Sequence, residues 1–233
     1  MCFTRKKSSI KFYYNISGKV LELCCQFRDL GVIMDQKLTF SSHIEYITNA
    51  ALKTLGFIIR ATHDFTDIYC IKLLFYTLVR SKMEYCSVIW KPYQQIYINL
   101  LENVLRKFCK YSYYKMFGSY PVRHCEQRAL LSIVNEYSML SRSNLSCLIF
   151  LQKIVKREIS CARLLTEVQF YVPRLSCRVP ITFYYNVPNT FHHYNCPLLT
   201  CFRLYNCLGV KLDIFHVKLT NKSVKQTILA YYS

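Results

Sequence analysis

Apolar residues recur at helical spacing through the middle of the chain. The clearest stripe lies on a helix predicted at roughly 43–61, where each apolar residue follows the last by three or four positions. Its members are Ile44, Ile47, Ala51, Leu55 and Ile58. The same pattern predicts two further helices, at roughly 67–86 and 94–110. Amphipathic helices of this length bury their apolar stripes against one another, so the pattern indicates a helical bundle.

The first forty residues follow a strand pattern instead. Ile10–Ile16 is rich in aromatic and β-branched residues, and the Ser17-Gly18-Lys19 stretch that follows is a turn signal. Val20–Phe27 is expected to continue as the partner strand. This combination predicts a β-hairpin. Arg28–Met34 is predicted to continue as a further extended stretch that ends at Asp35.

The second half of the chain is less regular. Tyr111–His124 is rich in tyrosine and contains a proline, so we expect a loop there. Helical patterning returns at 126–134 and again at 139–157. Beyond that point it decays into polar and proline-containing sequence, which predicts an irregular tail with one short helix at Ser223–Ala230.

Together these patterns predict an α+β fold that is mainly α. An N-terminal β-hairpin (1–40) would pack on a three-helix bundle (41–120), because a hairpin of this size is not stable alone. A helical extension and an irregular tail (121–233) would complete the chain. We take these three segments as the predicted domains.

The charge balance favours a polyanionic partner. Lysine and arginine together number 31 against 13 aspartates and glutamates, which gives a formal net charge of +18. Such an excess attracts nucleic acid, because phosphates release counterions when cations approach them. The alternative is that these residues only keep the surface soluble. No two aspartates are adjacent, so chemistry that needs paired carboxylates lacks its ligands.

Cysteine usage and the chain ends bear on the compartment. The 13 cysteines show no regular framework spacing, and no apolar segment follows the basic residues of Met1–Ser9. We therefore expect reduced thiols and a cytoplasmic or nuclear location. The longest apolar runs, such as Leu148–Leu151, are far too short for a membrane span, so no membrane partner is expected.

A group of histidines and cysteines near the C-terminus invites a zinc interpretation. His192 and His193 are followed by Cys196 and Cys201. Structural zinc sites usually pair two short Cys or His loops, and this spacing fits neither arrangement well. We therefore predict no metal site.

Three stretches carry a family likeness. Residues 27–44 read Phe-Arg-Asp-Leu-Gly-Val-Ile-Met-Asp-Gln-Lys-Leu-Thr-Phe-Ser-Ser-His-Ile. Residues 78–90 read Leu-Val-Arg-Ser-Lys-Met-Glu-Tyr-Cys-Ser-Val-Ile-Trp, and residues 101–108 begin with Leu-Glu and end with Arg-Lys-Phe. Together they resemble the palm-to-thumb passage in reverse transcriptases of LINE-type (non-LTR) retrotransposons, in particular the jockey-like insect elements.

The resemblance implies that 1–40 is the end of a polymerase palm, that 41–120 is a thumb and that 121–233 follows the thumb. The family's polymerase site uses an early palm aspartate and a Tyr/Phe-x-Asp-Asp loop to hold two Mg²⁺ ions. This chain has no Asp-Asp pair, and its first residue corresponds to a position beyond that loop. We therefore expect no enzyme activity of the chain itself and no cofactor, because Mg²⁺ would belong to the missing palm.

A polymerase thumb holds the product duplex by its sugar–phosphate backbone. The resemblance therefore predicts binding of an RNA/DNA hybrid or RNA without sequence preference. The predicted contacts are Arg5, Lys6, Lys7, His43, Lys53, Arg60, Arg106, Lys107 and Lys110. Two of these predictions have a structural alternative. Arg5–Lys7 could be a solvated turn, and His43 could tie the end of the strand to the following helix.

The other expected partners are the missing polymerase domains of a full-length protein, and no small-molecule substrate is expected. Two alternatives stay open. A domesticated module could bind protein through the aromatic surface left bare where palm and fingers would dock. The chain could also be a pseudogene product without a function of its own.

Overall fold

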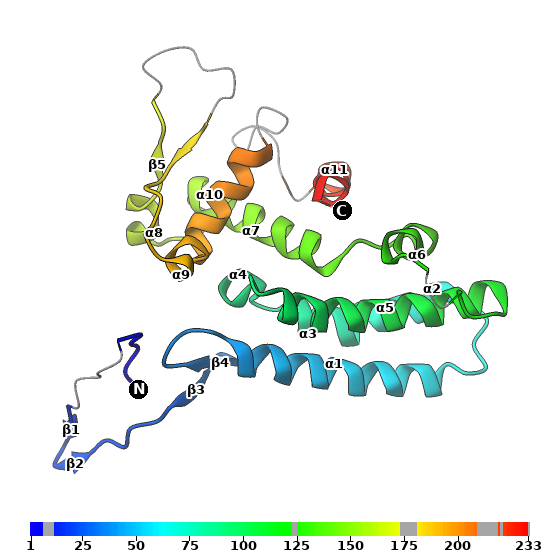
Figure 1. Cartoon of the computed structure of the whole chain (residues 1–233), viewed down its shortest axis with the longest axis horizontal. Helices are drawn as coiled ribbons and strands as arrows, with labels where there is room; N and C mark the ends of the chain where they lie inside the picture. Colours follow the sequence, from blue (N-terminus) through cyan, green and yellow to red (C-terminus); the bar gives the residue numbers. More distant parts are fainter. Residues whose placement is uncertain (7–11, 123–124, 173–180, 209–218, 220, 233) are drawn as a thin grey trace.

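The computed structural model describes residues 1–6, 12–122, 125–172, 181–208, 219 and 221–232. Helices dominate, and the described strands pair in short antiparallel hairpins, which confirms the predicted α+β, mainly α class. Figure 1 shows the helices in layers. The first layer is α1 (Ser41–Ala61), the middle one contains α2 (Ile68–Phe75) and α5 (Gln95–Phe117), and α7 (Met139–Val155) lies beyond them.

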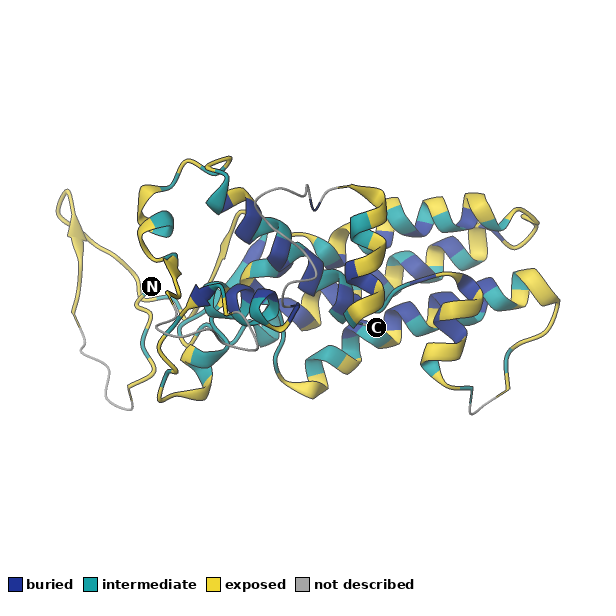
Figure 2. Cartoon of the chain, turned by 90° about the horizontal axis from the view of Figure 1, so that it is seen from above, coloured by how far each residue is buried: buried dark blue, intermediate teal, exposed yellow. Residues whose placement is uncertain are grey.

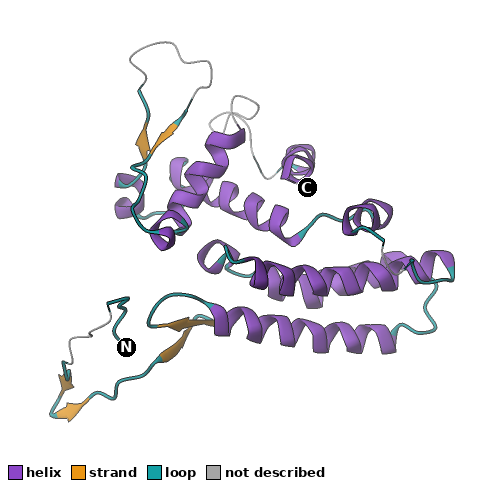
Figure 3. Ribbon diagram, in the orientation of Figure 1, coloured by secondary structure: helices purple, strands orange, loops and turns teal. Residues whose placement is uncertain are grey.

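Two short hairpins stand where a single longer one was predicted. β1 (Asn15–Ile16) pairs with β2 (Lys19–Val20) across the predicted Ser-Gly turn, whose two residues both have positive φ. Within the described residues, only the ends of the predicted strands Ile10–Ile16 and Val20–Phe27 pair, so those strands were predicted too long. Residues 12–23 are exposed, and no helix covers this hairpin (Figure 3).

A second hairpin connects the N-terminal region to the helices. β3 (Gln26–Asp29) pairs with β4 (Val32–Asp35), and the turn between them is formed by Leu30 (φ 44°) and Gly31 (φ 87°). The prediction of one extended stretch over Arg28–Met34 was therefore wrong. Val32 is buried and belongs to the core of the bundle, so this hairpin packs on α1 and the first one does not.

α1 buries all five residues of the predicted apolar stripe. No side chain caps the start of α1, which Phe40 precedes in a left-handed conformation. The Asp35 carboxylate instead accepts hydrogen bonds from the backbone N–H groups of Phe40 (2.9 Å) and Thr39 (2.8 Å). Burial raises the pKa of Asp35, but these hydrogen bonds outweigh it and the net pKa is lowered.

The second predicted helix has an irregular middle. α2 continues through a π-helical turn, η1 (Tyr76–Arg80), into α3 (Ser81–Glu84). Asp67 caps the start of α2 by accepting a hydrogen bond from the Tyr69 N–H at 2.8 Å. A turn of this kind rotates the side chains that follow it relative to a regular helix.

The third predicted helix is longer than expected. After the short α4 (Ser87–Trp90), α5 continues to Phe117, so the loop predicted from Tyr111 onward begins about two turns later. The reason is that Tyr111 and Ser112 are buried at the contact with α1. Gly118 ends the helix with a φ of 73°, and its N–H donates to the Tyr114 carbonyl at 2.8 Å.

The second half confirms the predicted helices at 126–134 and 139–157 as α6 (Gln127–Val134) and α7. The tail holds more regular structure than predicted. Its elements are α8 (Ala162–Thr166), β5 (Gln169–Phe170), β6 (Phe183–Tyr184), α9 (Phe191–Tyr194), α10 (Pro197–Leu208) and α11 (Lys222–Tyr232). The short helix expected at Ser223–Ala230 is thus found as α11. α10 was missed because its first residue is a proline, and the prolines in this part of the chain indicated irregular structure. Proline is tolerated at the first position of a helix.

The buried residues form two clusters. One lies between α1, α2, α5 and α6, and the other between α7, α10 and α11. Figure 2 shows the buried positions along the inner faces of the helices, with exposed positions outside. α7 belongs to both clusters, since Met139 packs in the first and Leu148 in the second.

Candidate nucleic-acid interface

The outer face of α1 carries a row of cations and aromatic rings, which we call the α1 stripe. It consists of Tyr46, Lys53, Phe57 and Arg60. Their spacings of seven, four and three residues place them on one side of the helix, opposite the buried stripe. Tyr46 and Phe57 are 46% and 59% exposed, and no described element lies on the far side of α1 (Figure 1).

Two cations that sequence reasoning missed lie beside one end of the α1 stripe. The Arg28 guanidinium stands over the Tyr46 ring, 5.4 Å from its centroid. Lys82, on α3, donates a hydrogen bond from Nζ to Thr54 Oγ1 at 2.9 Å. Both line a surface pocket of about 460 Å³ that also includes Tyr46 and Tyr85. The sequence signal was weak, because residues 27–44 and 78–90 each contain a second lysine or arginine, Lys37 and Arg80.

A second group of predicted contacts lies on α5. Arg106, Lys107 and Lys110 occupy the side of the helix away from its buried residues, with Lys107 exposed and the other two half-buried. The Arg106 Nε atom has no hydrogen-bond partner among the described residues. The structure thus supports the prediction that these three residues face outward from the apolar core.

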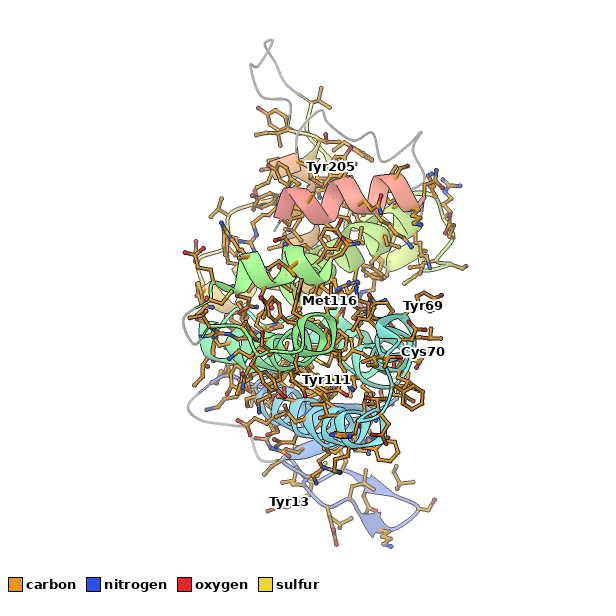
Figure 4. All side chains as sticks on the ribbon, turned by 90° about the vertical axis from the view of Figure 1, so that its right-hand side faces the viewer. Tyr13, Tyr69, Cys70, Tyr111, Met116 and Tyr205 are labelled. Carbon is orange, nitrogen blue, oxygen red and sulfur yellow. The ribbon has the colours of Figure 1, made fainter. Side chains whose placement is uncertain are left out.

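The contact between α1 and α5 fixes where the α1 stripe and the α5 cations lie relative to each other along the bundle axis. The Tyr111 hydroxyl lies 2.8 Å from Thr62 Oγ1, and Tyr111 stands where the two helices meet (Figure 4). The Lys115 ammonium donates to the His63 carbonyl beyond the end of α1. Because both contacts join the C-terminal parts of the two helices, Arg60 lies level with Lys110 along the bundle.

Most of the bundle's buried carboxylates are engaged inside it. Glu136 is buried and accepts from Arg142 Nη2 at 2.7 Å and from the Tyr76 hydroxyl. Glu84 lies 3.3 Å from Arg80 Nε and 3.7 Å from Arg142 Nη1. Burial, together with the Glu136 carboxylate, raises the pKa of Tyr76, so this hydroxyl stays protonated.

The outward cations, by contrast, lack such partners. Within the described part of the chain, no ion pair involves the lysine and arginine residues of the α1 stripe or the α5 group. Unpaired surface cations keep their full electrostatic attraction for an external polyanion. The two helices therefore present uncompensated positive charge.

His43 does not fit the predicted phosphate contact. The side chain is 2% exposed, its Nδ1 accepts from the Ile33 N–H at 3.3 Å, and its ring packs edge-on against Trp90. Burial and the nearby Arg28 lower the pKa of His43, so the ring is neutral near pH 7. These contacts support the structural alternative, in which His43 ties the β4 strand to α1.

The N-terminal basic residues lie apart from the other candidates. The Arg5 Nε donates to the Lys37 carbonyl at 2.8 Å, which fixes it near the start of α1. Lys6 is exposed, and Lys7 lies outside the described residues. Since α1 is 21 residues long, Arg5 and Arg60 are separated by roughly 30 Å of helix, so the structure does not bring them together.

The histidine and cysteine group of the tail is also dispersed. Cys201 is buried and shares a hydrogen bond with Cys147 of α7, while the His192 ring contacts Tyr93. Among the described residues, no group of three or more His, Cys, Asp or Glu side chains is arranged to hold a metal ion. In the same parts of the chain, no helix combines the length and apolarity that crossing a bilayer requires.

Comparison of the chain with protein-family models, with curated proteins and with solved structures finds no match.

Proposed function

We propose that this chain binds the backbone of an RNA/DNA duplex, without sequence preference, as the thumb-containing C-terminal part of a retrotransposon-type reverse transcriptase. The observation that carries the binding proposal is the α1 stripe, in which exposed rings alternate with cations that no described carboxylate pairs. Cations on such a surface bind the phosphates of a nucleic-acid backbone. The family origin rests on the three sequence motifs.

The chain has no Asp-Asp pair with which to hold catalytic metal ions. On this proposal it positions nucleic acid and does not itself catalyse polymerisation. Any Mg²⁺-dependent chemistry would belong to a palm on another part of a longer polypeptide. The expected partners are accordingly nucleic acid and those polymerase domains.

The binding proposal is tested by titrating the full chain with an RNA/DNA hybrid over a series of salt concentrations. Affinity should fall steeply with salt, because each phosphate contact releases counterions. Replacing Lys53 and Arg60 together by glutamine should make the log–log slope shallower by about two. The Lys153→Gln and Arg163→Gln double variant removes the same charge from exposed positions elsewhere and is the matched control.

Equal slopes for the two double variants would exclude the α1 stripe as the binding surface. A folded chain that fails to bind the hybrid at low salt would reject the function itself. The family origin has its own test in the genomic sequence upstream of this chain. It predicts an in-frame Tyr/Phe-x-Asp-Asp loop, and unrelated coding sequence there would contradict it.

A second candidate function is favoured by the exposed N-terminal segment. Residues 12–23 carry large apolar side chains that the helices do not cover: Phe12, Tyr13, Tyr14, Ile16, Val20, Leu21 and Leu23. Exposed apolar surface of this kind usually marks a protein interface. Under this alternative, the chain forms a protein–protein association that persists at high salt and can be followed by light scattering. Replacing Phe12, Tyr13 and Tyr14 by serine would abolish this association. Binding of the hybrid would be unchanged.

A further inference from the structure

A second basic site lies between the bundle and the tail, away from the α1 stripe. A cavity of about 500 Å³, here called the Lys91 cavity, opens between the segment after α4, α7 and α10. Its described lining contains two cations, Lys91 and Arg203, and no aspartate or glutamate. Its volume lies in the range of sites that bind small ligands.

Lys91 reaches the cavity from a mostly buried position. Its ammonium donates to Asn144 Oδ1 at 2.5 Å, which leaves two of its three protons for other acceptors. Burial lowers the pKa of Lys91. The neighbouring Cys147 and Cys201 thiols oppose this effect, and Arg203 adds to it. Lys91 and Arg203 thus both line this cavity, and each bears on the charge of the other.

Arg203 is held in place by Tyr194, Thr200 and Asn195, since its Nη2 also donates to Asn195 Oδ1 at 3.5 Å. Its guanidinium packs over the Tyr194 ring, 3.7 Å from the centroid, and Nη2 donates to Thr200 Oγ1 at 3.3 Å. The Nε atom is buried and has no hydrogen-bond partner among the described residues. A fixed guanidinium with free donors is the usual arrangement for binding a phosphate or carboxylate.

Two partly buried cations without a counter-charge are unfavourable. An anion bound between them would offset the repulsion and take up the unused donors. Part of the remaining wall is apolar and is formed by Pro92, Ile98, Leu140 and Leu204. The Tyr185 hydroxyl and the Asn195 amide add polar groups at its edge.

We propose that the Lys91 cavity binds a phosphate monoester attached to a planar, apolar body of about mononucleotide size. Lys91 and Arg203 would hold the phosphate, and the apolar wall would contact the base or a similar ring. The site is separate from the α1 stripe and does not depend on the function proposed above. It differs from the sequence-based expectation of no small-molecule substrate, and the experiment below tests the two against each other.

Two sources could supply this chemistry: a free mononucleotide, or the phosphorylated 5′ end of a nucleic-acid strand. The test is calorimetric titration of the full chain with AMP, adenosine, and short oligonucleotides with and without a 5′-phosphate. AMP should bind at least about tenfold more tightly than adenosine, because only AMP carries the charged group. Binding of the phosphorylated oligonucleotide but not of AMP would assign the site to strand ends.

Variants locate the binding. Arg203→Gln should weaken AMP, or the phosphorylated oligonucleotide, by about tenfold or more, whereas Arg163→Gln, exposed on α8, should not. Lys91→Met should act in the same direction. Lys91 is largely buried, so its replacement can disturb folding. If the Lys91→Met variant does not fold, the result for Arg203→Gln decides.

A chemical readout keeps the test independent of affinity measurements. Cys207 is exposed and lines the cavity, so bound ligand should slow its alkylation by iodoacetamide in peptide mass mapping. Cys25 is exposed in the N-terminal region and should react at an unchanged rate. The proposal is overturned if neither AMP nor the phosphorylated oligonucleotide binds. It is equally overturned if adenosine binds as tightly as AMP. The other contrary results are that Arg203→Gln leaves the ligand affinity unchanged, or that bound ligand leaves the rate of Cys207 alkylation unchanged.

Discussion

Tyr111 fastens α5 to the C-terminal end of α1. Its hydroxyl lies 2.8 Å from Thr62 Oγ1 and 3.1 Å from the Thr62 carbonyl, in a buried position. We predict that Tyr111→Phe lowers the free energy of unfolding by about 1 kcal/mol, because the ring still fills its space but a buried hydrogen bond is lost. Chemical denaturation measures this. Tyr69→Phe is the matched control, since that side chain is 71% exposed, and an equal loss in both variants would contradict the prediction.

Glu102 predicts a pH effect. Burial raises the pKa of Glu102, although the Leu140 N–H (3.1 Å) and the Gln127 amide (2.8 Å) donate to it. A raised pKa means that the folded chain holds this proton more tightly than the unfolded chain. The contribution of Glu102 to stability is therefore full at low pH, and it is lost as the pH rises from the unfolded through the folded pKa.

Glu102→Gln removes this titration. We expect the melting temperature of the variant, relative to the parent protein, to be higher at pH 7 than at pH 4. Thermal unfolding at the two pH values checks this. Glu45→Gln, on an exposed position of α1, supplies the baseline for loss of a surface charge. A difference between the variant and the parent that is the same at both pH values would show that Glu102 does not titrate in this way.

The residues that sequence analysis identified correctly are those fixed by periodicity. The five members of the α1 apolar stripe are buried because a 3.6-residue repeat alone decides which side of a helix faces the core. The polar residues at the helix starts were harder to predict. Asp67 caps α2, whereas Asp35 accepts hydrogen bonds from the backbone just before α1, and the helical repeat encodes neither role. The burial of His43 depends on Trp90, which is 47 residues away along the chain.

At the scale of elements, two glycines give opposite predictions. Gly118 ends α5 in a left-handed conformation, so Gly118→Ala should destabilise the protein by about 1 kcal/mol even though a Cβ would meet nothing within 4 Å. Gly56 lies inside α1, where a Cβ would make only an ordinary 3.6 Å contact with Arg60. Gly56→Ala should therefore stabilise by roughly 0.5–1 kcal/mol. Denaturation curves that move in the same direction for both variants would refute this account.

Element ends were predicted less well than element types. Tyrosines after position 110 resembled a loop, yet α5 extends to Phe117 because α1 provides a surface on which to bury Tyr111. α10 was missed for the complementary reason. Its proline and cysteines gave no clear helical signal, and Phe202 and Tyr205 are buried only because α7 and the β5–β6 hairpin lie against them. Tertiary contacts decided both cases.

At the scale of the whole molecule, the sequence located single cations but not the surfaces they form. Lys53 and Arg60 were predicted as contacts, and the structure adds the exposed rings that accompany them. Arg28 and Lys82 lie far from α1 in sequence and reach Tyr46 and Thr54 only through the packing of β3 and α3 beside that helix. The Lys91 cavity was not predictable for the same reason, since Lys91 and Arg203 are more than a hundred residues apart.

The two hydrophobic clusters raise the question of whether the bundle and the tail unfold together. Trp90 is the chain's only tryptophan and is buried in the first cluster, while Leu148 is buried in the second. Because α7 contributes side chains to both clusters, we predict one cooperative transition. Leu148→Ala should then lower stability by about 2–5 kcal/mol and shift the Trp90 fluorescence transition as far as the far-UV circular dichroism transition.

The matched control is Leu73→Ala, which removes the same atoms from a side chain that is 50% exposed and should move neither transition appreciably. Separate transitions in the parent protein would show two independently folding units. So would a Leu148→Ala effect seen by circular dichroism but not by Trp90 fluorescence. In that case the Lys91 cavity, which is built from both sides, would form only when the two units are folded and in contact. A single shared transition instead makes the cavity an integral part of the fold, present whenever the α1 stripe is.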